Sequence, residues 1–134
     1  MGYLIPTLTP TLTLTSTDMS SDETLNLSVT DTLSIAGGAQ SFQKQVTATK
    51  STLLLAASYT KSYVYLQNLD SSIVINIGMD TAADDSIDDD ATDLFIELAG
   101  GEFAFFPWSA TYNLHVDAAK ETPILEVRIY QAAA

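Results

Sequence analysis

The feature that most constrains this 134-residue chain is a two-residue period of apolar and polar side chains. It is clearest at residues 7–15, where Leu8, Leu12 and Leu14 alternate with threonines. Successive residues of a strand point to opposite faces, so this period predicts a half-buried β-strand with threonines on its other face. Pro6 and Pro10 cannot donate to a sheet ladder. The segment is therefore predicted to be an edge strand or an extended arm, lying on its own domain or on a neighbouring subunit.

Short segments with the same period follow along the chain, separated by turn residues such as the glycine pairs at 37–38 and 100–101. About nine or ten short strands at roughly eight- to twelve-residue spacing are typical of a β-sandwich or jelly roll. No segment keeps the apolar period of a helix, so almost no helix is expected. The two strands that flank the turn at residues 68–72 are predicted to pair as a hairpin. The predicted strands after the first cover residues 24–29, 32–35, 42–49, 52–57, 63–68, 73–78, 94–98, 103–108, 112–116 and 124–130.

These patterns predict an all-β fold with a single β-sandwich or jelly-roll-like domain over residues 23–134. An extended N-terminal arm or edge strand, rich in threonine, leucine and proline, precedes it over residues 1–22. A chain of this length buries roughly two thirds of the surface that its unfolded form exposes. Because the chain has no cysteine, its core must hold without disulfides. The predicted core residues are Val64, Leu66, Val74, Ile75, Ile77, Leu94, Ile96, Phe103, Phe105, Leu114, Val116, Leu125, Val127 and Ile129.

The formal net charge of −12 disfavours two classes of partner. Nucleic acids and anionic membranes bind clustered Lys and Arg, and no two basic residues are adjacent here. No apolar run approaches the ~18–20 residues of a spanning helix. The N-terminal residues also lack the basic and apolar segments of a signal peptide. We therefore expect no nucleic-acid partner and no membrane partner.

Aspartate dominates one segment, with seven of the fourteen residues at 80–93. Carboxylates at this density are able to ligate calcium, which takes about 6–8 oxygen ligands. The spacing is not that of an EF-hand loop, because its glycine and its final glutamate are missing. The alternative is a solvated loop that charge repulsion keeps outside the core, and we expect no metal site and no cofactor. The weak candidate metal ligands are Asp84, Asp85, Asp88, Asp89 and Asp90.

His115 and Trp108 are the other candidates for a role in catalysis or binding. His115 is the only histidine and has no cysteine or Ser–Asp partner at a recognised spacing, so a surface strand histidine is expected rather than a general base. Trp108 lies in an aromatic segment of a kind that caps a core, forms a subunit interface or stacks on sugars. Phe106 and Trp108 are the candidate interface aromatics. Zinc-ligand and phosphate-loop patterns are absent, so we predict no catalytic residue and no enzyme activity.

Five segments carry a resemblance: KSYVYLQNLDSS at residues 61–72, IVINIG at 73–78, LAGGEFAFFP at 98–107, YNLHV at 112–116 and LEVRIY at 125–130. Together with the threonine-rich N-terminus, they resemble small β-sandwich virion proteins of tailed bacteriophages, particularly marine ones. Two departures are visible. The glycine pair at 100–101 replaces an expected Pro-Gly, and the acidic insertion at residues 84–93 is longer than is usual in those proteins.

The resemblance implies a non-enzymatic virion structural protein, located in the virion and assembled in the cytoplasm of the bacterial host. In its most specific form it implies a capsid decoration, or cement, protein that stabilises the shell through oligomerisation and strand or arm exchange. Its partners would be copies of itself, with a trimer favoured, and the major capsid protein or other virion proteins. Leu8, Leu12 and Leu14 are the candidate assembly residues of the arm.

Two alternatives remain open at the level of sequence. The first is a collar, tail or fibre-attachment protein of the virion. The second is a cation-dependent carbohydrate-binding module that uses residues 80–93 and Trp108. Calcium titration separates the second, because only a module that binds calcium gains thermal stability from it.

Overall fold

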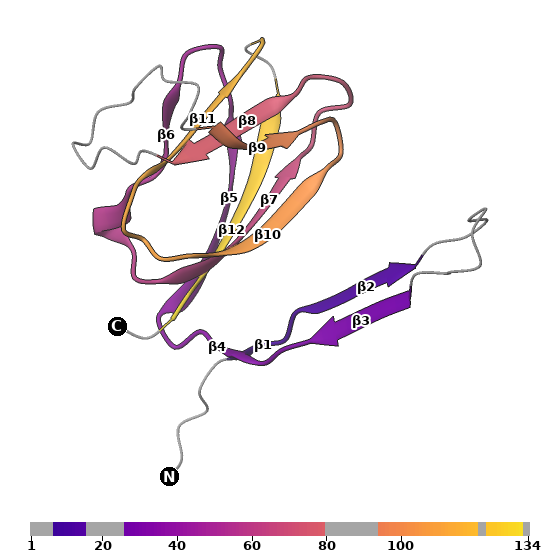
Figure 1. Cartoon of the computed structure of the whole chain (residues 1–134). Coiled ribbons are helices and arrows are strands. Elements are labelled where there is room, and N and C mark those ends of the chain that lie inside the picture. Colours follow the sequence, from indigo (N-terminus) through magenta and orange to yellow (C-terminus); the bar gives the residue numbers. More distant parts are fainter. Residues whose placement is uncertain (1–6, 16–25, 80–93, 121–122, 133–134) are drawn as a thin grey trace.

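The computed structural model describes residues 7–15, 26–79, 94–120 and 123–132. Within these residues the chain is made of β-strands, with one 3₁₀ turn, η1 (Ala56–Ser58), as its helical element (Figure 1). No helix in this part of the chain is long and apolar enough to cross a membrane. The strands are β1 (Thr7–Leu8), β2 (Thr11–Thr15), β3 (Asn26–Thr30), β4 (Leu33–Ser34), β5 (Gly38–Gln45), β6 (Ser51–Leu54), β7 (Ser62–Asn68), β8 (Ile75–Met79), β9 (Leu94–Leu98), β10 (Phe103–Trp108), β11 (Leu114–Ala118) and β12 (Ile124–Gln131).

Strands β5 to β12 form two four-stranded sheets that pack face to face (Figure 1). The first sheet has the order β10–β7–β12–β5 and the second has the order β6–β11–β8–β9, with antiparallel neighbours throughout. This is the strand order of a jelly roll, which is built from two Greek keys. The predicted all-β sandwich is confirmed. The predicted hairpin of β7 and β8 is wrong, because these two strands lie in opposite sheets and the turn between them crosses the sandwich.

The core lies between the two sheets and takes alternate residues from their strands. In β7, for example, Val64 and Leu66 are fully buried while the tyrosines beside them are only half buried. Ile96 is half buried, and the side chain of Leu94 lies outside the described residues. The core predictions that the structure confirms are Val64, Leu66, Ile75, Ile77, Leu114, Val116, Leu125, Val127 and Ile129.

Three core predictions are wrong, because Val74, Phe103 and Phe105 are exposed. In β10 the prediction placed the wrong set of alternate residues in the core. Phe106 and Trp108 point into the sandwich, so the phenylalanines that alternate with them point outward. Because side chains on a strand repeat every two residues, a shift of one residue moves each of them to the opposite face.

Asn68 connects the two corners where the chain crosses between the sheets, one between β7 and β8 and the other between β9 and β10. Its side chain is fully buried, and its Nδ2 donates to the carbonyls of Ile73 (2.7 Å) and Leu98 (2.9 Å). Its Oδ1 accepts a hydrogen bond from the amide of Asp70 at 2.9 Å. The Asp70 carboxylate accepts hydrogen bonds from the amides of Ser72 and Ile73, and these bonds lower the pKa of Asp70. The turn after β7 is thus fixed by side-chain hydrogen bonds.

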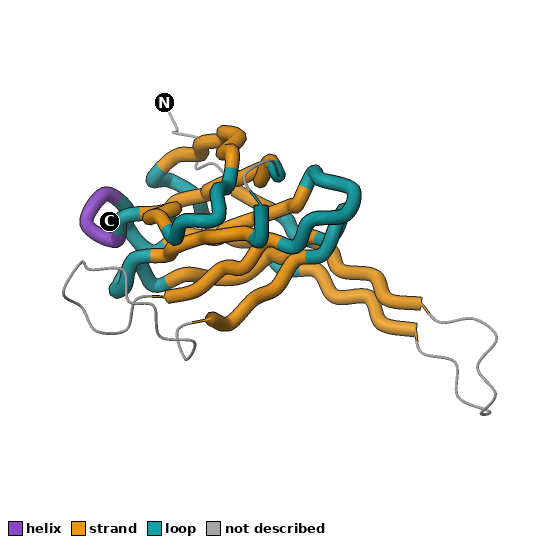
Figure 2. The backbone as a smooth tube through the Cα atoms, turned by 90° about the horizontal axis from the view of Figure 1, so that it is seen from above, coloured by secondary structure: helices purple, strands orange, loops and turns teal. Residues whose placement is uncertain are grey.

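The N-terminal strands form a ribbon outside the sandwich. β2 pairs antiparallel with β3, and β1 pairs with β4 at the base of the ribbon. The ribbon projects past the edge of the sandwich in two perpendicular views (Figures 1 and 2). The expected arm is therefore one half of a hairpin, and the other half, within residues 26–34, lies beyond the predicted boundary at residue 22.

Candidate assembly surface

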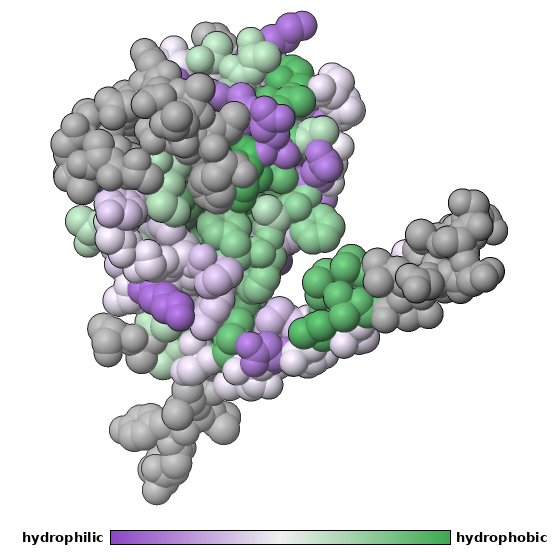
Figure 3. Space-filling view, viewed as in Figure 1, coloured by the Kyte–Doolittle hydropathy of each residue, from purple (hydrophilic) through white to green (hydrophobic). Residues whose placement is uncertain are grey.

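One face of the β2–β3 hairpin is apolar and exposed. The strand register places Leu12 opposite Val29 and Leu14 opposite Leu27. Directly opposed residues share a face of the ribbon, so these four side chains form one surface, here called the hairpin patch, and each is 40–50% exposed. Figure 3 shows the patch on the side of the hairpin that is turned toward the sandwich. Because an isolated two-stranded hairpin is marginally stable in water, a partner that covers this patch would stabilise it.

A second exposed apolar surface lies on the outer face of the first sheet, where β7 pairs with β10. The rings of Tyr65 and Phe103 stack with their centroids 6.2 Å apart. The rings of Tyr63 and Phe105 stack at 6.5 Å, and the Lys61 Nζ lies 6.0 Å from the Tyr63 ring centroid. We call these four aromatic residues the aromatic ladder. Phe103 is 61% exposed and Phe105 is 40% exposed, so the ladder offers ring surface to a partner.

A pocket of about 390 Å³ joins the base of the hairpin to the ladder. Leu8 and Pro10 line it from the N-terminal segment, and strands of the first sheet supply the other residues. Arg128 Nη2 donates to Glu126 Oε1 at 3.1 Å, and this hydrogen bond raises the pKa of Arg128. The two charges in the pocket wall therefore offset one another. The pocket is lined by Leu8, Pro10, Tyr65, Gln67, Phe105, Glu126, Arg128 and Tyr130.

The predicted arm residues all lie in the pocket or on the hairpin patch. Leu8 lines the pocket, whereas Leu12 and Leu14 belong to the hairpin patch. Their cross-strand neighbours Leu27 and Val29 are further members of the surface that the arm prediction did not include. The signal for them is present in the sequence, because residues 24–29 repeat the same two-residue period.

The two predicted interface aromatics lie elsewhere. Trp108 is 1% exposed, its Nε1 donates to the carbonyl of Tyr112 at 3.0 Å, and its ring lies 5.9 Å from that of Tyr59. Phe106 is half buried and packs against the core. Trp108 therefore caps the core, and it has no free ring face for a subunit or a sugar. The exposed aromatic residues of this sheet belong to the aromatic ladder instead.

The expectation of a surface histidine is also wrong. His115 is 4% exposed. It lies in β11, which is flanked on both sides by the paired strands β6 and β8. Alternation within β11 assigns His115 to the face opposite Leu114 and Val116, but it does not tell whether that face is covered.

Cation binding has no support in the described part of the chain. Asp84, Asp85, Asp88, Asp89 and Asp90, the candidate ligands, lie outside it. Among the described residues, no three His, Cys, Asp or Glu side chains gather into a group that could hold a metal ion. The contacts that the hairpin patch and the aromatic ladder offer are hydrophobic and aromatic.

Comparison with known proteins adds one structural likeness. No known protein family matches the chain, and no curated protein matches it. Among solved structures, a chain from Bacillus endospore appendages, described as a family of disulfide-linked pili, is similar with a TM-score of 0.46. The two are 12% identical, and the alignment covers 72% of this chain and 87% of that chain.

Proposed function

We propose that this chain is a non-enzymatic structural protein that assembles with copies of itself. The observation that carries the proposal is the β2–β3 hairpin, which projects from a jelly-roll domain with its apolar patch exposed. Contiguous exposed apolar surface on a soluble protein marks an interaction site. The aromatic ladder is a second such surface on the same chain.

The charge distribution supports self-association through the hairpin. The chain carries a formal net charge of −12, but β2 and β3 contain no charged residue. Repulsion between exposed charges fades over a Debye length of about 8–10 Å at physiological salt. A contact through β2 and β3 therefore brings no carboxylate of these two strands against a second acidic copy. Because the chain has no cysteine, contacts between copies contain no disulfide.

In its more specific form, the proposal is a capsid decoration protein in the virion of a tailed bacteriophage. The resemblance at residues 61–72 and 98–107 supports it, and so does the jelly-roll order, which recurs in capsid proteins. Since a fold does not determine a function, the sequence resemblance carries most of this step. The partners would be further copies, as a trimer, and the major capsid protein. A collar, tail or fibre junction is the alternative position.

Quantitative mass spectrometry of purified particles tests the virion proposal. A copy number of the same order as that of the major shell protein supports a decoration protein. A few copies per particle would place the chain at a collar, tail or fibre junction, where symmetric rings are small. Absence of the chain from purified particles would contradict a role in the virion.

Burial of Trp108 counts against the carbohydrate-binding alternative. That alternative required Trp108 to stack on a sugar, and this side chain is buried and hydrogen-bonded within the core. Its other component, residues 80–93, lies outside the described residues. Self-assembly is therefore the function that the described surface supports best.

A further inference from the structure

We infer that the hairpin patch of one copy packs on the aromatic ladder of a second copy. This inference rests on the proposed self-assembly and specifies the two surfaces that meet. The patch consists of Leu12, Leu14, Leu27 and Val29 on β2 and β3. The ladder consists of Tyr63, Tyr65, Phe103 and Phe105 on β7 and β10.

The hairpin does not cover the ladder of its own chain, because its base is fixed. Leu8 pairs with Leu33 in the β1–β4 ladder. The amide of Asp31 donates to the carbonyl of Pro10 at 3.2 Å. Leu8 and Pro10 also line the pocket beside Tyr65. From this base β2 and β3 lead away from the sheet, so the patch and the ladder of one chain are separated by open space (Figure 3).

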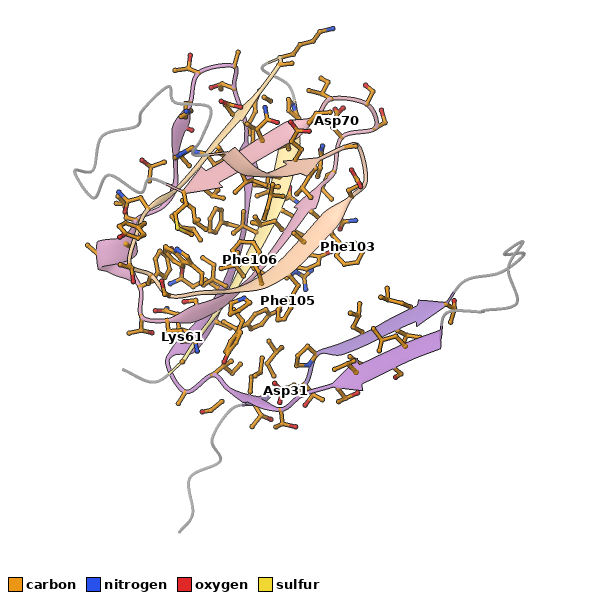
Figure 4. All side chains as sticks on the ribbon, in the orientation of Figure 1. Asp31, Lys61, Asp70, Phe103, Phe105 and Phe106 are labelled. Atoms are coloured by element: carbon orange, nitrogen blue, oxygen red, sulfur yellow. The ribbon has the colours of Figure 1, made fainter. Side chains whose placement is uncertain are left out.

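The contact joins two different surfaces and is therefore heterologous. Phe103 and Phe105 lie on the side of β10 turned toward the hairpin, and Phe106 lies on its core side (Figure 4). The hairpin patch lies on the side of the ribbon turned toward the sandwich (Figure 3). Contacts of this heterologous kind close into rings or continue as filaments.

The surfaces also match in size and chemistry. Each is two antiparallel strands wide, and along each strand the contacting side chains are two residues apart. This spacing is roughly 6.6–6.8 Å in any strand, and packed sheets place such faces about 10 Å apart. Neither surface contains a carboxylate, although the chain has 17 acidic residues. Branched aliphatic side chains against exposed rings bury apolar area on both partners.

The main experiment uses two variants that each keep one half of the contact. Leu12→Thr with Leu14→Thr removes the patch, and Phe103→Thr with Phe105→Thr removes the ladder. All four positions are exposed, and threonine suits a strand, so circular dichroism and melting should show a folded sandwich. Each variant alone should self-associate at least about tenfold more weakly than the wild-type chain in sedimentation velocity.

Mixing the two variants gives the decisive result. The patch variant still offers a ladder, and the ladder variant still offers a patch, so an equimolar mixture should form one-to-one dimers and no larger species. The matched control is Leu69→Thr with Val74→Thr, which removes two exposed apolar side chains elsewhere. The control should assemble like the wild-type chain.

Disulfide trapping gives a second measurement with single substitutions, because the natural chain has no cysteine. Chains carrying Leu14→Cys and chains carrying Phe103→Cys should form a mixed disulfide dimer on oxidation. Leu14→Cys mixed with Leu69→Cys should not. A chain that carries both Leu14→Cys and Phe103→Cys should cross-link between chains.

Three results would overturn the inference: patch and ladder variants that assemble like the wild type, a variant mixture that stays monomeric, or a disulfide that forms within one chain. If the wild-type chain assembles while both variants do so equally well, self-assembly stands and only these two surfaces are wrong. If the wild-type chain stays monomeric, the proposed function fails together with the inference.

Discussion

Replacing Asn68 with alanine should destabilise the sandwich by about 2–4 kcal/mol. Its fully buried side chain makes three hydrogen bonds of 2.7–2.9 Å, with Ile73, Leu98 and Asp70. Each such bond contributes roughly 0.5–1.5 kcal/mol, and alanine also leaves two carbonyls without their side-chain donor. For a domain of this size the loss corresponds to a fall of roughly 7–14 °C in Tm.

Urea denaturation and calorimetry at neutral pH and one fixed protein concentration measure this effect. Asn76→Ala is the matched control, because Asn76 is half buried and its Nδ2 donates to Asp117 Oδ1 at 2.9 Å. Loss of that one partly solvated bond should cost about 1 kcal/mol or less. If Asn68→Ala were no more destabilising than Asn76→Ala, the claim that Asn68 holds the two corners together would be refuted.

Three other changes test the fold. Gly100→Ala should cost more than about 2 kcal/mol in urea denaturation, because an added Cβ would lie 2.5 Å from the Ser71 carbonyl group; unchanged stability would contradict that close approach. Asp70→Asn should remove a stabilisation that is present above the ordinary pKa of 3.8 and is lost as pH falls through the lowered pKa of the folded state; the difference in Tm from the wild type should therefore shrink in acid, and a constant difference would refute the cause. Trp108→Phe should cost about 1–3 kcal/mol, because it removes the hydrogen bond to Tyr112 and leaves a cavity; calorimetry should show a lower Tm, and an unchanged Tm would count against Trp108 as the core cap.

The two-residue period was enough to predict the strands and most of the central core. It works for β7 and β12 because their apolar and polar residues alternate cleanly, so one phase alone buries the aliphatic side chains. In β10, three phenylalanines surround one alanine, and both phases present large apolar residues to the core. The register resolves this ambiguity. Phe105 lies opposite Tyr65, so the outward phase of β7 sets the outward phase of β10.

Tertiary arrangement accounts for the other errors. The turn chemistry at residues 68–72 suits a hairpin as well as a crossover between sheets, and the pairing of β7 with β12 rather than β8 decides between them. The candidate surface was predicted only in part. Leu12 and Leu14 were found because the nearby prolines mark their segment as an edge strand or arm. Phe103 and Phe105 were missed because large aromatic residues on a strand usually indicate a core.

The proposed function depends on self-assembly of the chain through non-covalent contacts. Sedimentation velocity of the unmodified chain over a wide range of concentration measures this self-assembly without any substitution. We expect species whose masses are multiples of the 14.4 kDa chain and grow with concentration. A single species of 14.4 kDa at every concentration would contradict it.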